Sequence, residues 1–210
     1  MRALGARSVP VVARGERFVY AQVMRDVVEF LGLDESTAPE LSPEALAARM
    51  DRVLETAIRL VRQMPDAEIE RQLPNRPRAW RVLMHHVFQI PAAFLQMEAT
   101  GKRLEYEVLV AEPPDSMRTS VAIADFGETV RIKFSAWWQG VRNESFAGQV
   151  PVYFGATTRH EMFERTVWHS AQHVRQIAAL LTQLNIAADR PLSAEDIRGL
   201  PLTDKIWDEG

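Results

Sequence analysis

Two histidines, His169 and His173, lie four residues apart in a stretch, residues 158–177, whose apolar positions recur with helical spacing. At about 100° per residue, both histidines fall on the same helix face as a series of apolar side chains. These side chains are Met162, Ile177, Leu180 and Leu184. Burying two imidazoles costs free energy unless their ring nitrogens find partners, and a divalent metal ion would bind both. The spacing therefore favours a metal site that needs a third ligand. The alternative is a pair of core histidines hydrogen-bonded to glutamine or backbone.

Two further histidines, His85 and His86, are candidates for the third ligand in a helix expected to begin at Trp80. The inward direction of that helix is given by its apolar stripe, which consists of Trp80, Leu83, Met84, Val87 and Phe94. His86 lies about 110° from the centre of this stripe and His85 about 150°. We therefore expect His86 to be the ligand and His85 to be a solvated or supporting residue. His160 lies on nearly the opposite side of its helix from His169 and is expected to be exposed.

The composition limits the possible classes of protein. The chain has 210 residues, of which 47% are hydrophobic and 25% charged, so it can bury the core of one domain with a small appendage. A net charge of −3 without a clustered basic face predicts neither nucleic acid nor membrane as a partner. Because the chain has no cysteine, protein-supplied metal ligands must be His, Asp or Glu, and a thiol nucleophile must come from outside. No segment has the pattern of a transmembrane helix or a signal peptide, which predicts a cytoplasmic location.

The first 41 residues predict a small ββα unit and a linker. Residues 9–20 read as a β-hairpin with its turn at 14–16, and residues 23–31 read as a helix capped by Gly32. Residues 33–41 read as a linker. Since a lone hairpin has two open edges, we expect residues 1–32 to pack on the rest of the chain or to pair with a second copy in a homodimer.

The remainder, residues 42–210, is dominated by helical periodicity. The four long helices expected are 43–64, 80 to about 94, 121–141 and 158 to about 184. Ser42 with Pro43 marks the start of the first helix, and the Thr158 capping box marks the start of the fourth. Pro91 is expected to bend the second helix, and Gly127 lowers the helix propensity of the third. A short helix is expected from Ser193. The long connection 101–118 and the helix order predict a four-helix bundle, in which cofactor sites lie between facing helices.

Over residues 42 to about 184 the chain resembles the DinB-like four-helix bundles. Their mark is one histidine on the second helix and a His-x-x-x-His pair on the last, matched here by His86, His169 and His173. The resemblance implies a mainly α fold and a divalent metal with open coordination positions. Zinc and nickel are the expected ions, because imidazole suits both.

A second resemblance concerns residues 1–32. Ser8-Val9-Pro10-Val11-Val12, followed by a glycine turn, a strand and a helix, is similar to the C-terminal half of a glutaredoxin or thioredoxin-like fold. In such folds the proline, here Pro10, is cis and contacts a thiol ligand. Because this chain has no Cys-x-x-Cys motif, thiol–disulfide chemistry is not carried over. The segment is interpreted as a structural remnant or a dimerisation element.

The DinB-like resemblance leaves two functions open. One is a metal-dependent transferase or isomerase that acts on a small electrophile with a low-molecular-weight thiol as cosubstrate. The other is a non-catalytic homodimer that binds metal or a small molecule in a stress response. An acid or base beside the histidines would favour an enzyme, but none is identifiable. Glu164 and Gln172 are interpreted as solvated helix positions, and the alternative is that they are hydrogen-bond partners of the metal-binding histidines. Enzymatic activity is therefore left undecided by the sequence.

Overall fold

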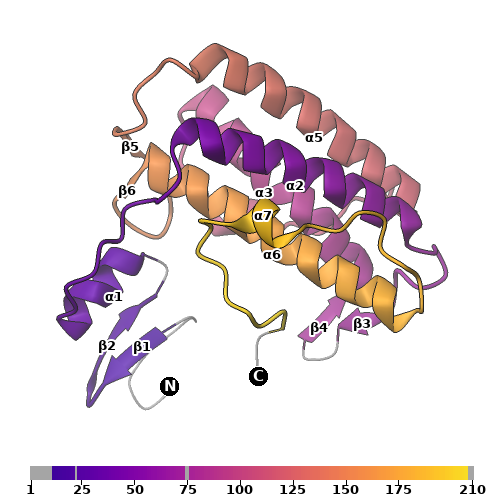
Figure 1. Cartoon of the computed structure of the whole chain (residues 1–210), viewed down its shortest axis with the longest axis horizontal. Helices are drawn as coiled ribbons and strands as arrows, with labels where there is room; N and C mark the ends of the chain where they lie inside the picture. Colours follow the sequence, from indigo (N-terminus) through magenta and orange to yellow (C-terminus); the bar gives the residue numbers. More distant parts are fainter. Residues whose placement is uncertain (1–10, 22, 74–75, 208–210) are drawn as a thin grey trace.

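The computed structural model describes residues 11–21, 23–73 and 76–207. It is mainly α-helical with small strand pairs, which confirms that part of the fold prediction. The four long helices are α2 (Pro43–Gln63), α3 (Trp80–Thr100), α5 (Ser120–Val141) and α6 (Arg159–Gln183). They run alongside one another, and α2 and α3 each contact both α5 and α6 (Figure 1). The assignment of this arrangement to the DinB-like bundles stays a prediction.

The shorter elements lie at the ends and between the long helices. They are β1 (Val11–Arg14), β2 (Arg17–Tyr20), α1 (Met24–Leu31), β3 (Gln72–Leu73), β4 (Arg76–Ala79), α4 (Tyr106–Leu109), β5 (Gln149–Val150), β6 (Thr157–Thr158) and α7 (Ala194–Ile197). The strands form three antiparallel pairs, β1 with β2, β3 with β4 and β5 with β6. The last two pairs and α4 were not expected from the sequence, because elements of two to four residues carry no measurable periodicity.

The helix starts follow from local capping chemistry. The Ser42 hydroxyl accepts a hydrogen bond from the Ala45 backbone at 3.2 Å, and Pro43 occupies the first helical position of α2. Thr158 and Glu161 form a capping box at the start of α6. A second capping box opens α7 at Ser193. The predicted starts of these helices are therefore confirmed.

Gly127 of α5 faces side chains of α3 and α2 at close range. A Cβ atom there would lie 2.6 Å from two ring carbons of Phe88 and 3.0 Å from a side-chain carbon of Ile58. Glycine lowers helix propensity by about 1 kcal/mol, yet it lets the helices pack this tightly. The residue that weakened the helix prediction thus has a packing role.

An aromatic cluster fills the space between α3, α5 and α6. Its members are Phe94, Phe134, Trp137, Phe146 and Phe163. Within it, Glu98 of α3 pairs with Arg159 at the start of α6, and their side chains are only 8% and 14% exposed. The indole nitrogen of Trp137 donates to the same Glu98 carboxylate at 2.9 Å. This buried pair ties the beginning of α6 to the end of α3.

The N-terminal elements lie beside the start of α6 (Figure 1). Arg25 of α1 donates to the Ala156 carbonyl at 2.8 Å and lies 3.7 Å from the Glu161 carboxylate. The hairpin turn is shorter than expected, because Arg14 belongs to β1 and Gly15 provides the left-handed conformation with φ +64°. Ser8, Val9 and Pro10, which carry the thioredoxin-like resemblance, lie outside the described residues. The division into segments and the homodimer stay predictions.

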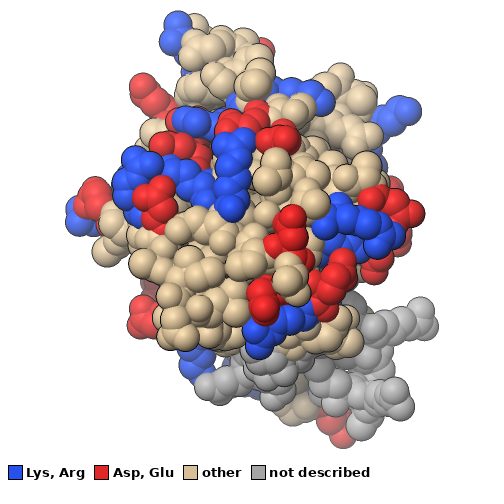
Figure 2. All heavy atoms as spheres, turned by 90° about the vertical axis from the view of Figure 1, so that its right-hand side faces the viewer, with Lys and Arg blue, Asp and Glu red and all other residues tan. Residues whose placement is uncertain are grey.

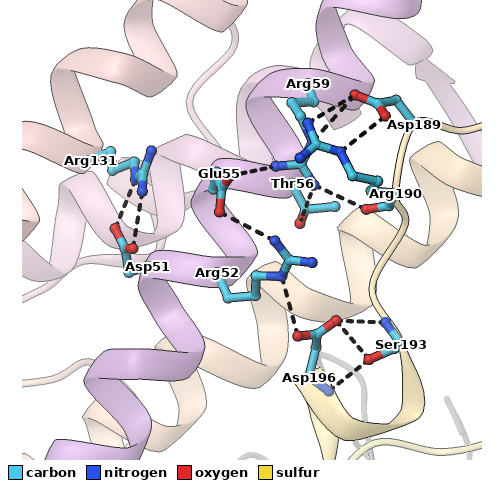
Figure 3. A network of polar contacts seen from close by, with 10 residues as sticks. All are labelled: Asp51, Arg52, Glu55, Thr56, Arg59, Arg131, Asp189, Arg190, Ser193 and Asp196. Carbon is cyan, nitrogen blue, oxygen red and sulfur yellow. Dashed lines mark hydrogen bonds and ion pairs between the residues drawn. The ribbon is translucent and has the colours of Figure 1, made fainter.

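Residues 185–198 run along α2 and are held there by a charged network (Figure 3). Arg59 donates to the Arg190 carbonyl at 3.0 Å and lies 3.5 Å from the Asp189 carboxylate. Arg52 donates at 3.2 Å to Asp196, the residue that completes the α7 capping box. Because Arg59 and Arg52 lie about two turns apart on α2, this part of the chain follows the surface of that helix (Figure 1).

Charges of both signs are interspersed on the face drawn in Figure 2 rather than separated by sign. Along the described parts of the chain, none of the helices combines the length and apolar character needed to cross a membrane.

Candidate metal centre

Helices α3 and α6 bring His86, His169 and His173 together. The ring centroids are 5.4 Å apart for His86 and His169, 5.0 Å for His86 and His173, and 4.9 Å for His169 and His173. Each residue offers one ring nitrogen, and these nitrogens all lie within 4.8 Å of one another. Three imidazole nitrogens in this arrangement could hold a metal ion.

A direct link between the two helices fixes the cluster. The hydroxyl of Ser170, which is fully buried, donates to the Val87 carbonyl at 3.1 Å. Ser170 directly follows one cluster histidine, and Val87 directly follows another. The register of α6 against α3 is therefore set next to the imidazoles themselves.

Gln176 fixes the orientation and tautomer of His173. The Gln176 amide nitrogen donates to the Ile206 carbonyl at 2.9 Å, so its oxygen faces His173 Nδ1, 2.7 Å away. Since an amide oxygen only accepts, the network assigns the proton to Nδ1 and the lone pair to Nε2. Hydrogen bonds of this kind orient metal-binding histidines in many proteins.

The segment that orients Gln176 is fastened to α6 by further bonds. Gln172 donates to the Ile206 carbonyl at 2.8 Å, and Arg175 donates to the Thr203 carbonyl at 2.7 Å. These contacts hold residues 203–206 along the face of α6 that carries His173.

The surroundings favour neutral imidazoles. Burial, together with the charges of His173 and Arg78, lowers the pKa of His86 to about 2, while a backbone hydrogen bond with Leu109 acts in the opposite direction. Burial also holds the pKa of His169 well below its ordinary value, with His173 and His86 as the next causes. Neutral imidazole is the form that binds a metal ion.

His85 lies outside the cluster, although it is as buried as His86, at 3% against 5% exposure. Its ring stacks on Phe126 of α5 with 5.2 Å between centroids, and burial lowers its pKa to about 4. The expectation of a solvated His85 is thus wrong, because α5 covers this side of α3. His160, also expected to be exposed, is half-buried, and its Nε2 lies 2.8 Å from the Leu41 carbonyl.

A cavity of about 980 Å³ opens beside the cluster. His169 and His173 line it from α6, the N-terminal elements line it from one side, and residues 199–203 line it from another. Trp168 and Trp207 add aromatic surface. Two of the three histidines are therefore accessible to a small molecule, which suits a site with open coordination positions.

Glu164, interpreted from the sequence as a solvated position, lines the cavity together with two arginines that the sequence analysis did not single out. Glu164 is half-buried, and burial raises the pKa of its carboxyl to about 7, with Glu40 as the next cause. Arg165 and Arg78 also line the cavity, and both lower the pKa of His169. The available signal was spacing: Glu164, Trp168 and the two α6 histidines share one broad helix face. The cover that buries this face comes from distant segments.

Comparison with protein-family models and with curated proteins gives no match for this chain.

Proposed function

We propose that the chain is a divalent-metal-dependent member of the DinB-like superfamily, in which His86, His169 and His173 hold zinc or nickel. The observation that supports this most directly is the meeting of three imidazole nitrogens within 4.8 Å at the wall of a cavity. A closed structural site would need a fourth protein ligand, whereas three ligands beside a cavity leave room for a substrate atom.

We further propose that the protein is an enzyme that joins a low-molecular-weight thiol to a small electrophile, or isomerises that electrophile. The metal, when bound, supplies Lewis acidity that lowers the pKa of a thiol or water. In thiol addition to a carbon–carbon double bond, an S–C bond forms, the π bond breaks, and the thiol proton moves to the neighbouring carbon. Reversal after rotation about the new single bond gives an isomer and returns the thiol.

Residues of the chain fit the remaining tasks. Glu164, with its pKa raised to about 7, can accept and return a proton near neutral pH. Gln176 holds His173 in the Nδ1–H tautomer, in which the Nε2 lone pair can bind a metal. Trp168 stacks on His169 with 5.5 Å between centroids and forms the apolar wall of the cavity next to the cluster.

The metal site is tested by elemental analysis of protein purified without a histidine tag. Alanine substitution of His86, His169 or His173 is expected to remove most of the bound metal, because each loss leaves two ligands. His85→Ala is the matched control, since His85 is the equally buried neighbour of a proposed ligand and lies outside the cluster. Full metal occupancy in His86→Ala contradicts the assignment.

The enzyme proposal is tested separately on cobalt-substituted protein. A small thiol at millimolar concentration is expected to change the visible spectrum, and His173→Ala is expected to lose that change. The same protein is expected to accelerate addition of the thiol to an activated alkene. If no thiol alters the spectrum and no addition is accelerated, the non-catalytic binding function replaces the enzyme proposal.

A further inference from the structure

A row of stacked groups leads from the histidine cluster into the cavity. The His169 ring stacks on Trp168 with an interplanar angle of 30°. The guanidinium carbon of Arg165 lies 5.6 Å from the centroid of the Trp168 ring and 4.7 Å from that of Phe154. All four residues line the cavity. A planar cation is thus held one indole ring away from the proposed metal.

The setting of Arg165 favours an anionic ligand. Burial is the main cause that lowers its pKa, which means that its charge has lost part of its hydration, and a hydrogen bond with Tyr153 acts in the opposite direction. An anionic group placed against a poorly hydrated guanidinium restores favourable electrostatics, and a carboxylate matches its planar fork. Arg78 of β4 adds a second positive charge close to His169.

Glu161 and Glu164 line the cavity from the first two turns of α6. Glu161 is engaged by Thr158 in the capping box and lies 3.7 Å from Arg25. Glu164 is influenced by Glu40 and Glu161 rather than by the histidines. The charges that act on His169 are those of Arg165, Arg78 and the other two histidines, so the electrostatic surroundings of this imidazole are basic.

We propose that the cavity binds a small organic carboxylate, whose anionic group lies against Arg165 and Arg78 while its apolar or unsaturated part covers Trp168. A ligand in this position places its remaining end at His169 and His173. The inference rests on the proposed function in one respect: the end of the ligand at the histidines is taken to be the electrophilic group that reacts. The proposed electrophile is then a molecule that also carries a carboxylate.

Two probes of the same shape test the charge requirement: phenylacetate and the neutral phenylacetamide. Binding to the full chain is measured by isothermal titration calorimetry, with and without bound metal. We expect phenylacetate to bind about tenfold more tightly than phenylacetamide, since a charge-assisted hydrogen bond replaces a neutral one. The preference is expected in the metal-free protein as well, because it arises from the arginines.

Arg78→Gln and Arg165→Gln are expected to reduce or abolish the preference. Arg165→Lys serves if the glutamine variant does not fold, and it should weaken the preference by removing the planar fork. Arg62→Gln is the control, because Arg62 is an exposed arginine that pairs with Asp125 and Glu128 away from the cavity.

The carboxylate proposal is overturned if neither probe binds at millimolar concentration or if both bind equally. It is also overturned if the preference requires metal and survives both arginine variants, because the metal would then be the partner of the anion. Failure of the metal proposal can be distinguished from failure of the carboxylate proposal. The first is measured as metal content, and the second as the preference for phenylacetate over phenylacetamide in metal-free protein.

Discussion

Replacing Glu164 by glutamine should change how the stability of the protein depends on pH. The carboxyl is half-buried at the cavity wall, and burial together with Glu40 raises its pKa from 4.5 to about 7. Between about pH 4.5 and 7, the Glu164 carboxyl therefore keeps its proton in the folded state but has released it in the unfolded state. The stabilisation is complete below pH 4.5 and is lost as the pH rises through 7.

The magnitude follows from the size of this shift. A shift from 4.5 to about 7 corresponds to about 3 kcal/mol at 1.36 kcal/mol per unit. Solvent reaches the half-buried carboxyl and screens it, so we expect a penalty of about 1–2 kcal/mol at pH 8 relative to the protonated state. Glutamine resembles the protonated carboxyl in shape and carries no charge, so Glu164→Gln should remove this penalty.

The assay is urea-induced unfolding of metal-free protein at pH 4.5, 5, 6, 7 and 8. Between pH 4.5 and 8, the free energy of unfolding of the wild type should fall by about 1–2 kcal/mol more than that of Glu164→Gln. Contributions from the histidines are common to both proteins and cancel in the comparison. Glu112→Gln, which changes an exposed glutamate before α5, should keep the wild-type dependence. If Glu164→Gln also keeps that dependence, the raised pKa is refuted.

Three further substitutions test the packing and the site. Gly127→Ala should lower the free energy of unfolding by about 1–2 kcal/mol, because overpacking against Phe88 outweighs the gain in helix propensity; a stabilised variant contradicts the close approach. Glu98→Gln should lower the free energy of unfolding by about 1–2 kcal/mol, because Arg159 loses its less exposed carboxylate partner and keeps only the exposed Glu144; an unchanged urea midpoint contradicts this. Gln176→Leu should keep the fold but weaken zinc binding about 10–100-fold in a chelator competition, whereas wild-type affinity excludes its orienting role.

The parts of the fold that could be predicted depend on local chemistry. The caps at Ser42, Thr158 and Ser193 act within three or four residues, so they place helix starts without knowledge of the tertiary structure. The choice between His85 and His86 as the member of the cluster was also local, because the apolar stripe of one helix gives its inward direction. The structure brings His86, and not His85, to the α6 pair.

The parts that could not be predicted depend on segments far apart in the sequence. Glu164 reads as a solvated helix position until Glu40 and the N-terminal elements cover that side of α6. His85 reads as a flanking residue until Phe126 stacks on it. Gln176 gains its role from Ile206, which follows it by thirty residues. Periodicity describes a helix face but not the loop that lies on it.

The link from Ile206 through Gln176 to His173 has a consequence for biosynthesis. During translation, the helices that carry all three histidines emerge from the ribosome before residues 203–206. An ion captured at that stage would meet an imidazole still free to rotate and to exchange tautomers. The histidine cluster reaches its final geometry only after the later segment has docked, so a metal ion would meet fixed imidazole donors only once residues 203–206 lie on α6.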